Sequence, residues 1–308
     1  MAADNILRSY GDANSKEDVV LNAIEILTAE ENKLLGLLGK TKAINTIHTF
    51  QTDTLDTPGS AAIAEGADYS YGALTTPNHL TNICQTIAKP FSVTFTQQNI
   101  EKYSGTDELQ RQTSKAMMNW GNSAEFDIVR STLVSGASGT TPKMSGIIEF
   151  ISKASNTTSH TSGTAFSASI LDGLMADNWE NSNGDVVTDV LVGSKLKQVV
   201  DTFTQKNNVV VNNPGGQTTI VRTVTTYETS FGTVTFHKHR YVQQSGDATG
   251  RVLGIRPDKI KLAYLMRPMV DDNIARSGPY TKRAILGQLT VEVRNQDSNF
   301  FADGFNID

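Results

Sequence analysis

The chain has few of the features that hold small extracellular proteins or membrane proteins together. It contains one cysteine, Cys84, so an intramolecular disulfide is impossible. No apolar run is long enough to span a bilayer, and residues 1–5 lack the basic and apolar regions of a secretory signal. These absences predict a protein that is made in a reducing cytoplasm and has no membrane segment.

Positive charge is also scarce. The sequence has 27 Lys and Arg against 32 Asp and Glu, a formal net charge of −5, and its basic residues do not cluster. Proteins that bind nucleic acid by neutralising phosphates normally carry a basic patch. We therefore expect no sequence-specific binding of nucleic acid.

Aromatic residues make up only 7% of the 308 residues, whereas hydrophobic residues as a whole make up 38%. That content suffices for one substantial core or for two joined lobes, and it is not that of a disordered chain. Ser, Thr, Asn and Gly are plentiful, which suits turns and extended segments. The sequence predicts a mixed α+β fold in which strands outnumber helices, without an internal repeat.

Residues 43–88 contain no Lys or Arg at all. The stretch is rich in Gly and Pro, its flanks have the pattern of extended chain, and its middle offers little to bury. We predict a long two-stranded excursion from the core, and an isolated hairpin of this kind is only marginally stable in water. It therefore needs another surface to lie on, and the candidate contact residues are Asp53, Asp56, Pro58, Glu65, Asp68, Tyr69 and Tyr71.

The strongest helical pattern covers residues 104–135. We expect Ser104 or Thr106 to cap its start and Gly136 to mark its end, which gives a helix of roughly 40 Å. The apolar stripe consists of Leu109, Thr113, Met117, Trp120, Ala124, Ile128 and Leu133. The opposite, polar face consists of Glu108, Arg111, Lys115, Asn119, Asn122 and Glu125.

Shorter patterns predict the remaining elements. Helices are expected at 15–27, 28–38, 170–179 and from 194 through 200, and Ser194 is interpreted as an N-cap. Strands are expected at 91–95, 186–192, 259–266 and 284–293, with a hairpin formed by 220–227 and 233–242 around 230–232. Residues 152–169 and 212–216 are expected to be loops.

A search for reactive groups predicts no catalytic residue, cofactor site or metal site. Ser194 follows a glycine at a strand-to-helix turn, but the sequence lacks the G-x-S-x-G of a nucleophile elbow. His237 and His239 share one face of a predicted strand, yet zinc needs further ligands and the other histidines are distant in sequence. Cys84 is interpreted as a small buried hydrophobe. A hydrolase using Ser194 and a metal enzyme using the two histidines are the catalytic alternatives.

Several segments, in their order along the chain, resemble the major capsid proteins of tailed bacteriophages, in particular the subgroup of the SU-ten phage head protein. The similar segments are 49–55 (Thr-Phe-Gln-Thr-Asp-Thr-Leu), 64–68 (Ala-Glu-Gly-Ala-Asp), 103–109, 224–236 and 289–295 (Leu-Thr-Val-Glu-Val-Arg-Asn). The resemblance covers nearly the whole chain. It implies the Johnson, or Hong Kong 97-like, capsid fold.

The resemblance also implies a division of the chain. It comprises an N-terminal arm at 1–45, an extended hairpin called the E-loop at 46–90, a peripheral P domain with its spine helix at 91–144, an axial A domain at 145–268, and a return to the P domain at 269–308. The implied function is structural and not enzymatic: self-assembly into hexamers and pentamers of an icosahedral shell. The alternative is another virion component, a tail or adhesion protein.

The implied location is the virion, with assembly in the host cytoplasm. The implied partners are further copies of the chain, scaffolding and portal proteins, and a decoration protein, around packaged DNA that is bound without sequence specificity and without any membrane. Some relatives cross-link their shells through an E-loop lysine. This chain has no lysine between Lys42 and Lys89, so we expect a non-covalent shell.

Overall fold

The computed structural model describes residues 32–55, 59–69, 71–72, 76–100, 107–136, 139–154, 157–182, 184–203, 210–212, 218–220, 225–244 and 246–307. The predicted helix at 15–27, the first part of the one at 28–38 and the predicted caps Ser104 and Thr106 lie outside these residues. So do Asp56 and Pro58. None of the helices in the described part is both long and apolar enough to cross a membrane.

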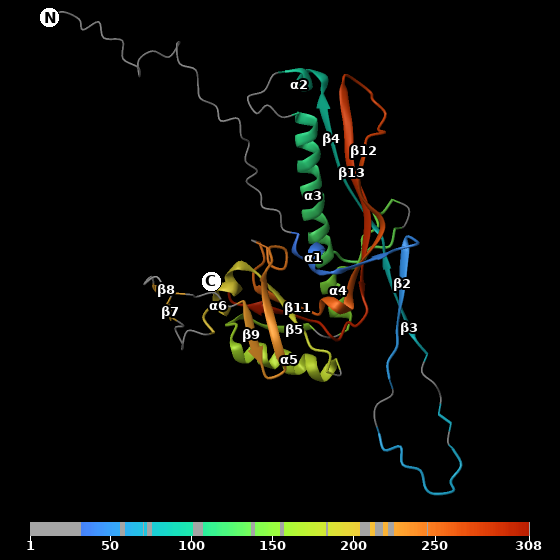
Figure 1. Cartoon of the computed structure of the whole chain (residues 1–308), viewed down its shortest axis with the longest axis vertical. Helices are drawn as coiled ribbons and strands as arrows, with labels where there is room; N and C mark the ends of the chain where they lie inside the picture. Colours follow the sequence, from blue (N-terminus) through green and yellow to red (C-terminus); the bar gives the residue numbers. More distant parts are fainter. Residues whose placement is uncertain are drawn as a thin grey trace, which may run out of the picture.

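One half of the body is a four-stranded sheet with a long helix packed on it (Figure 1). The strand order is β1 (Gly39–Lys42), β12 (Ile260–Asp271), β13 (Tyr280–Val293) and β4 (Gln85–Thr94). β1 runs parallel to β12, and the other pairs are antiparallel. Leu262, Ile285, Leu289 and Val291 of this sheet pack with the helix and with α1 (Lys33–Leu37) and α4 (Ile147–Lys153) in one core.

The long helix, α3, spans Glu108–Arg130, about 35 Å at its 23 residues. Asp107 caps it by accepting a hydrogen bond from the Leu109 backbone N–H at 3.0 Å. The indole N–H of Trp120 donates to the carbonyl of Ile87 at 3.0 Å. A Cβ at Gly287 would lie 2.6 Å from the Trp120 ring, so glycine at that position permits this close approach of helix and sheet.

The predicted stripe of α3 is correct in its middle and wrong at its edges. Trp120, Ala124 and Ile128 are buried, but Met117 is exposed, and so is Leu133, which lies beyond the end of the helix. Glu108 and Glu125, which we expected on the solvent face, are buried. Glu125 is covered because α1 packs against that side of the helix.

The other half of the body is a six-stranded sheet in the order β5 (Thr157–Thr164), β14 (Phe300–Phe305), β11 (Gly250–Ile255), β6 (Asp189–Val192), β10 (Gly232–Lys238) and β9 (Thr226–Thr229). α5 (Ala168–Asn181) and α6 (Ser194–Val200) cover it. Leu171 and Met175 of α5 join Val190, Val192 and Phe305 in a second core.

Several sequence-based assignments are wrong in this half. Residues 152–169 are not simply a loop, because they include the end of α4, all of β5 and the start of α5. β5 is polar, and it is a strand because it pairs in parallel with β14. Ser194 is not an N-cap, since Gly193 takes that position. Phe95 begins α2 (Phe95–Asn99) and does not extend the strand.

Three predicted elements are present with changed ends. β9 and β10 form the predicted hairpin around 230–232. β9 continues to Thr229 and β10 ends at Lys238, while residues 221–224 of the predicted first strand lie outside the described residues. β12 and β13 are longer than the predicted strands. β7 (Val210–Asn212) and β8 (Thr218–Ile220), on either side of the predicted loop 212–216, form a small hairpin.

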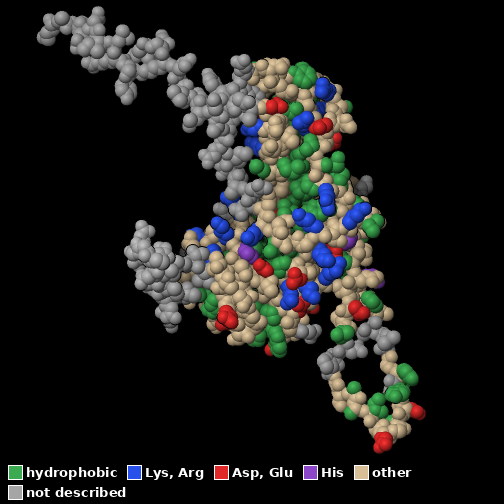
Figure 2. All heavy atoms as spheres, in the orientation of Figure 1, with side chains coloured by type: hydrophobic (Ala, Val, Ile, Leu, Met, Phe, Trp, Pro, Cys, Tyr) green, Lys and Arg blue, Asp and Glu red, His purple; other side chains and the backbone are tan. Residues whose placement is uncertain are grey.

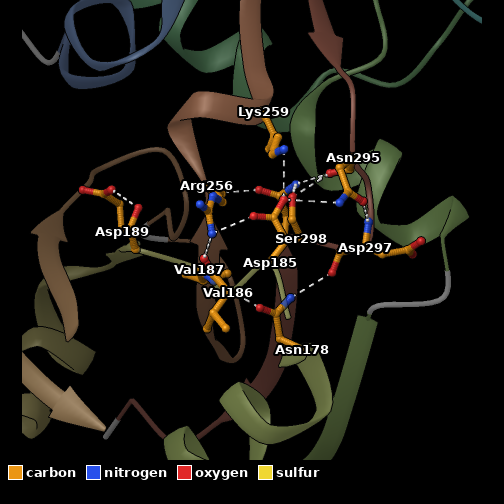
Figure 3. A network of polar contacts seen from close by, with 12 residues as sticks. Asn178, Asp185, Val186, Val187, Asp189, Arg256, Lys259, Asn295, Asp297 and Ser298 are labelled. Carbon is orange, nitrogen blue, oxygen red and sulfur yellow. Dashed lines mark hydrogen bonds and ion pairs between the residues drawn. The ribbon is translucent and has the colours of Figure 1, made fainter. Parts of the chain in front are cut away.

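A polar network ties the two halves together (Figure 3). Asp185, which precedes β6, forms ion pairs with Arg256 at 2.7 Å and with Lys259 at 3.3 Å; Lys259 lies in the turn η1 (Pro257–Lys259) before β12. Asn178 of α5 donates to the carbonyl of Asp297 at 2.9 Å, in the turn after β13. These contacts fix the six-stranded sheet to the ends of the two longest strands of the other sheet.

Candidate assembly interface

A hairpin projects from the body below the four-stranded sheet (Figure 1). Its strands are β2 (Ile47–Thr52) and β3 (Asn78–Ile83), paired in register from Ile47↔Ile83 to Thr52↔Asn78. β2 follows β1, and β3 continues into β4, so the hairpin is inserted between the two edge strands of that sheet. The excursion predicted for residues 43–88 is therefore present.

Residues 53–77 form the loop that closes this hairpin. Every described residue in it is exposed. The exposed fractions include 99% for Leu55, 91% for Tyr71, 74% for Tyr69 and 58% for Ile63. Exposed apolar surface is one feature of protein contact sites, so this loop is the candidate interface.

The base of the hairpin, in contrast, is firmly attached to the body. Asn82 of β3 is 1% exposed. Its amide donates to the carbonyls of Ser145 at 3.0 Å and Val291 at 2.8 Å, and its own carbonyl accepts from the Ser145 N–H at 2.8 Å. Phe50 of β2 is buried and its ring centroid lies 6.3 Å from that of Phe150.

A charged contact also holds the base. His48 of β2 contacts the buried carboxylate of Glu292 at 3.1 Å, and Arg294 contacts its other oxygen at 2.5 Å. Burial disfavours the charged form of Glu292, but the hydrogen bonds from Arg294 and His48 outweigh it, so the pKa of Glu292 lies below its ordinary value. The strand that leads into the hairpin is therefore anchored to β13.

A hollow of about 990 Å³ separates the hairpin from the body. Asp53 and Leu55 line it on the hairpin side, whereas Lys259, Lys261 and Arg294 line it on the body side. Figure 2 shows Lys and Arg side chains gathered on the body next to the hairpin. Asp53 of the arm thus faces a body surface on which these three basic residues lie beside Asp258 and Asp297.

The structure places five of the seven predicted contact residues on this one loop. Asp53, Glu65, Asp68, Tyr69 and Tyr71 are all exposed there, while the other two, as stated above, are not described. A single chain does not show what they contact, so their role at a subunit boundary stays a prediction. Leu55 and Ile63 of the same loop are also exposed but were not among the seven predicted contact residues.

The candidate reactive residues do not come together. His237 of β10 contacts Asp189 at 2.7 Å, whereas His239 lies just beyond the strand and contacts Glu125 at 3.0 Å. Within the described ranges, no group of three or more His, Cys, Asp or Glu could hold a metal ion. Cys84 is buried, and burial raises the pKa of its thiol, which leaves it less reactive.

Comparison with solved structures shows the fold. The chain resembles the capsid of a native GTA particle (TM-score 0.67, 9% identity, covering 99% of this chain and 100% of that chain). It also resembles a protein of Mycobacterium phage Adephagia (0.62, 12%, 98% and 98%) and the SrpI encapsulin of Synechococcus elongatus (0.62, 12%, 98% and 97%). This likeness confirms the predicted Hong Kong 97-like fold.

The sequence itself identifies the family. No match was found among curated proteins. The family model described as SU10 major capsid protein matches residues 8–305, nearly the whole chain. That match decides between a capsid subunit and a tail or adhesion component. The chain belongs to the SU10 major capsid protein family and is a structural protein of a phage capsid shell.

Proposed function

We propose that the subunit assembles into hexamers and pentamers in which the loop 53–77 lies across a neighbouring copy. The observation that carries this proposal is the complete exposure of the described loop residues, including Leu55 and Tyr71, on a hairpin whose base is buried. A neighbour that covered these side chains would remove about 25 cal/mol of unfavourable free energy per Å² of apolar surface. Many such modest contacts around each subunit close a shell.

The proposal divides the chain as the sequence resemblance implies: N-terminal arm 1–45, E-loop 46–90, P domain 91–144, A domain 145–268 and a return to P from 269. Strand pairing crosses some of these limits. β1 joins the four-stranded sheet from within the arm, and β14 joins the six-stranded sheet although it lies in the returning segment. β12 (Ile260–Asp271) also belongs to the four-stranded sheet although most of it lies within 145–268. The presence of two sheets supports a division into P and A domains, with limits that differ from the proposed ones at these strands.

The remaining parts of the proposal concern partners. We assign the chain no catalytic role, which fits a family of shell proteins. Scaffolding and portal proteins would act during assembly in the host cytoplasm, and a decoration protein would bind the finished shell. The enclosed DNA would be held without sequence-specific contacts. The shell would be non-covalent, because the hairpin carries no lysine.

The direct test is a variant of the loop that removes its apolar contacts and leaves the body unchanged. In the double variant Leu55→Ser and Tyr71→Ser we expect subunits with the parent's urea midpoint but few or no closed shells in negative-stain micrographs. Thr76→Ser, at an exposed position of the same loop, serves as the control and should assemble normally. Normal shells from the double variant would refute the proposed role of the loop.

A further inference from the structure

The interior holds a histidine–carboxylate pair that the shell function does not explain. His239 Nε2 lies 3.0 Å from Oε1 of Glu125, and both side chains are 0% exposed. A carboxylate withdrawn from water is strongly unfavourable unless hydrogen bonds satisfy it. The partners of Glu125 therefore indicate what the pair does.

Glu125 holds the start of α1. Its Oε1 accepts from the Leu34 N–H at 2.5 Å and its Oε2 from the Leu35 N–H at 3.0 Å. Amides in the first turn of a helix have no partner within that helix. Asn32 precedes α1 and lies against Gly121, one turn before Glu125, where a Cβ would come within 2.9 Å of the Asn32 Oδ1. The start of α1 is thus held on α3 in two ways: Gly121 leaves space for Asn32, and the Glu125 carboxylate accepts hydrogen bonds from the first-turn amides.

His239 is held from the other half of the body. Its Nδ1 accepts from the Tyr241 N–H at 3.3 Å, so the hydrogen of the neutral ring lies on Nε2 and is donated to Glu125. Its backbone N–H donates to the carbonyl of Val192, the last residue of β6, at 2.9 Å. The imidazole is therefore fixed to the six-stranded sheet.

We propose that the pair Glu125–His239 is a positioning clasp that couples the entry of the N-terminal chain to the six-stranded sheet. The contacts run from β6 through His239 to Glu125, and from there to the Leu34 and Leu35 amides. A shift of the segment after β10 relative to α3 would remove a donor from Glu125 and loosen α1. The direction in which the chain enters the body at Asn32 then follows the position of the second sheet.

The chain offers a matched control. His237 and Asp189 also form a histidine–carboxylate contact, at 2.7 Å, between β10 and β6 of the same sheet. Their side chains are 16% and 15% exposed, and they join neighbouring strands. Loss of this pair removes a similar histidine–carboxylate contact but leaves the side-chain contacts among His239, Glu125 and α1 in place.

Hydrogen exchange of the unassembled full-length subunit tests the clasp, followed by mass spectrometry of peptides that cover 33–38 and 239–244. In His239→Leu we expect the α1 peptide to exchange about tenfold faster, as the loss of a buried charge-assisted hydrogen bond implies. His239→Gln keeps a donor and an acceptor and should restore most of the protection. His237→Leu should leave the α1 peptide unchanged.

Two results would overturn the proposal. The first is α1 exchange in His239→Leu within about twofold of the parent. The second is a rise of the same size in every peptide, which would indicate a general loss of stability and not a coupling. Should His239→Leu fail to fold, Glu125→Gln replaces it, and it must accelerate exchange in both peptides. Because the readout is made on unassembled subunits, it is independent of whether the loop 53–77 forms shell contacts.

Discussion

The two ends of the β2–β3 hairpin differ sharply in burial. At the base, Asn82 is almost fully buried and bonded to two other segments, while at the far end Leu55 and Tyr71 contact nothing that would cover them. The contrast shows that exposure of the loop does not reflect loose packing of the hairpin as a whole. It leaves the apolar side chains of the described loop residues open to solvent.

Removal of the Asn82 side chain should have the largest effect on stability among these predictions, because it weakens the buried base of the hairpin. Asn82→Ala deletes the contacts to Ser145 and Val291 and leaves buried backbone groups unpaired. We expect a loss of about 3 kcal/mol in the free energy of unfolding, measured by urea denaturation. The control Asn78→Ala, at the exposed end of the same strand, should stay close to the parent. Equal stability of the two variants would mean that the base is not clamped.

A smaller and pH-dependent effect is expected at Glu292. The folded-state pKa of Glu292 is lowered, so the carboxylate stabilises the protein above its unfolded-state pKa, and this contribution is lost as the pH falls through the folded value. Glu292→Gln should therefore cost about 1 kcal/mol at pH 7. The difference from the parent should shrink as the pH falls below 4.5, the ordinary value for Glu.

The measurement is urea unfolding of both proteins from pH 7 to pH 3. Glu228→Gln, at an exposed position of the edge strand β9, controls for the loss of a negative charge and should show no such convergence. A gap between parent and Glu292→Gln that widens in acid would contradict the role assigned to His48 and Arg294.

The smallest effect on stability, and a clear one on assembly, is expected in the loop. Glu65→Gln with Asp68→Asn should change the free energy of unfolding by less than about 0.5 kcal/mol, because both residues are exposed. If these carboxylates face basic residues of a neighbour, assembly of the parent weakens with added salt more steeply than that of the variant. Light scattering at several salt concentrations compares the two. Identical salt dependence would restrict the loop's contribution to its apolar residues.

Sequence patterns within a short stretch of chain predicted the elements whose burial depends on that stretch alone. The α3 core positions Trp120, Ala124 and Ile128 follow from helical spacing, and the hairpin follows from a stretch that has little to bury. β5 could not be found, because its polar sequence becomes a strand only by pairing with β14, more than 130 residues later.

The candidate site was predictable to a similar degree. The exposed loop residues could be identified because absence of basic charge and of core residues is visible in sequence. The buried residues that hold α1 and the base of the hairpin could not be identified from sequence. Glu125 has the spacing of a solvent-facing residue, but the α1 amides, 90 and 91 residues away in sequence, and His239, 114 residues away, give it a buried role. His48 and Glu292 meet across 244 residues.

The insertion of the hairpin between β1 and β4 has a mechanical consequence. These strands are the opposite edges of the four-stranded sheet, so their separation is three inter-strand spacings, about 14 Å. Force applied to the arm would therefore load both edges of the sheet, through the pairing of β1 with β12 and of β4 with β13. Detaching the arm would require both rows of backbone hydrogen bonds to be broken.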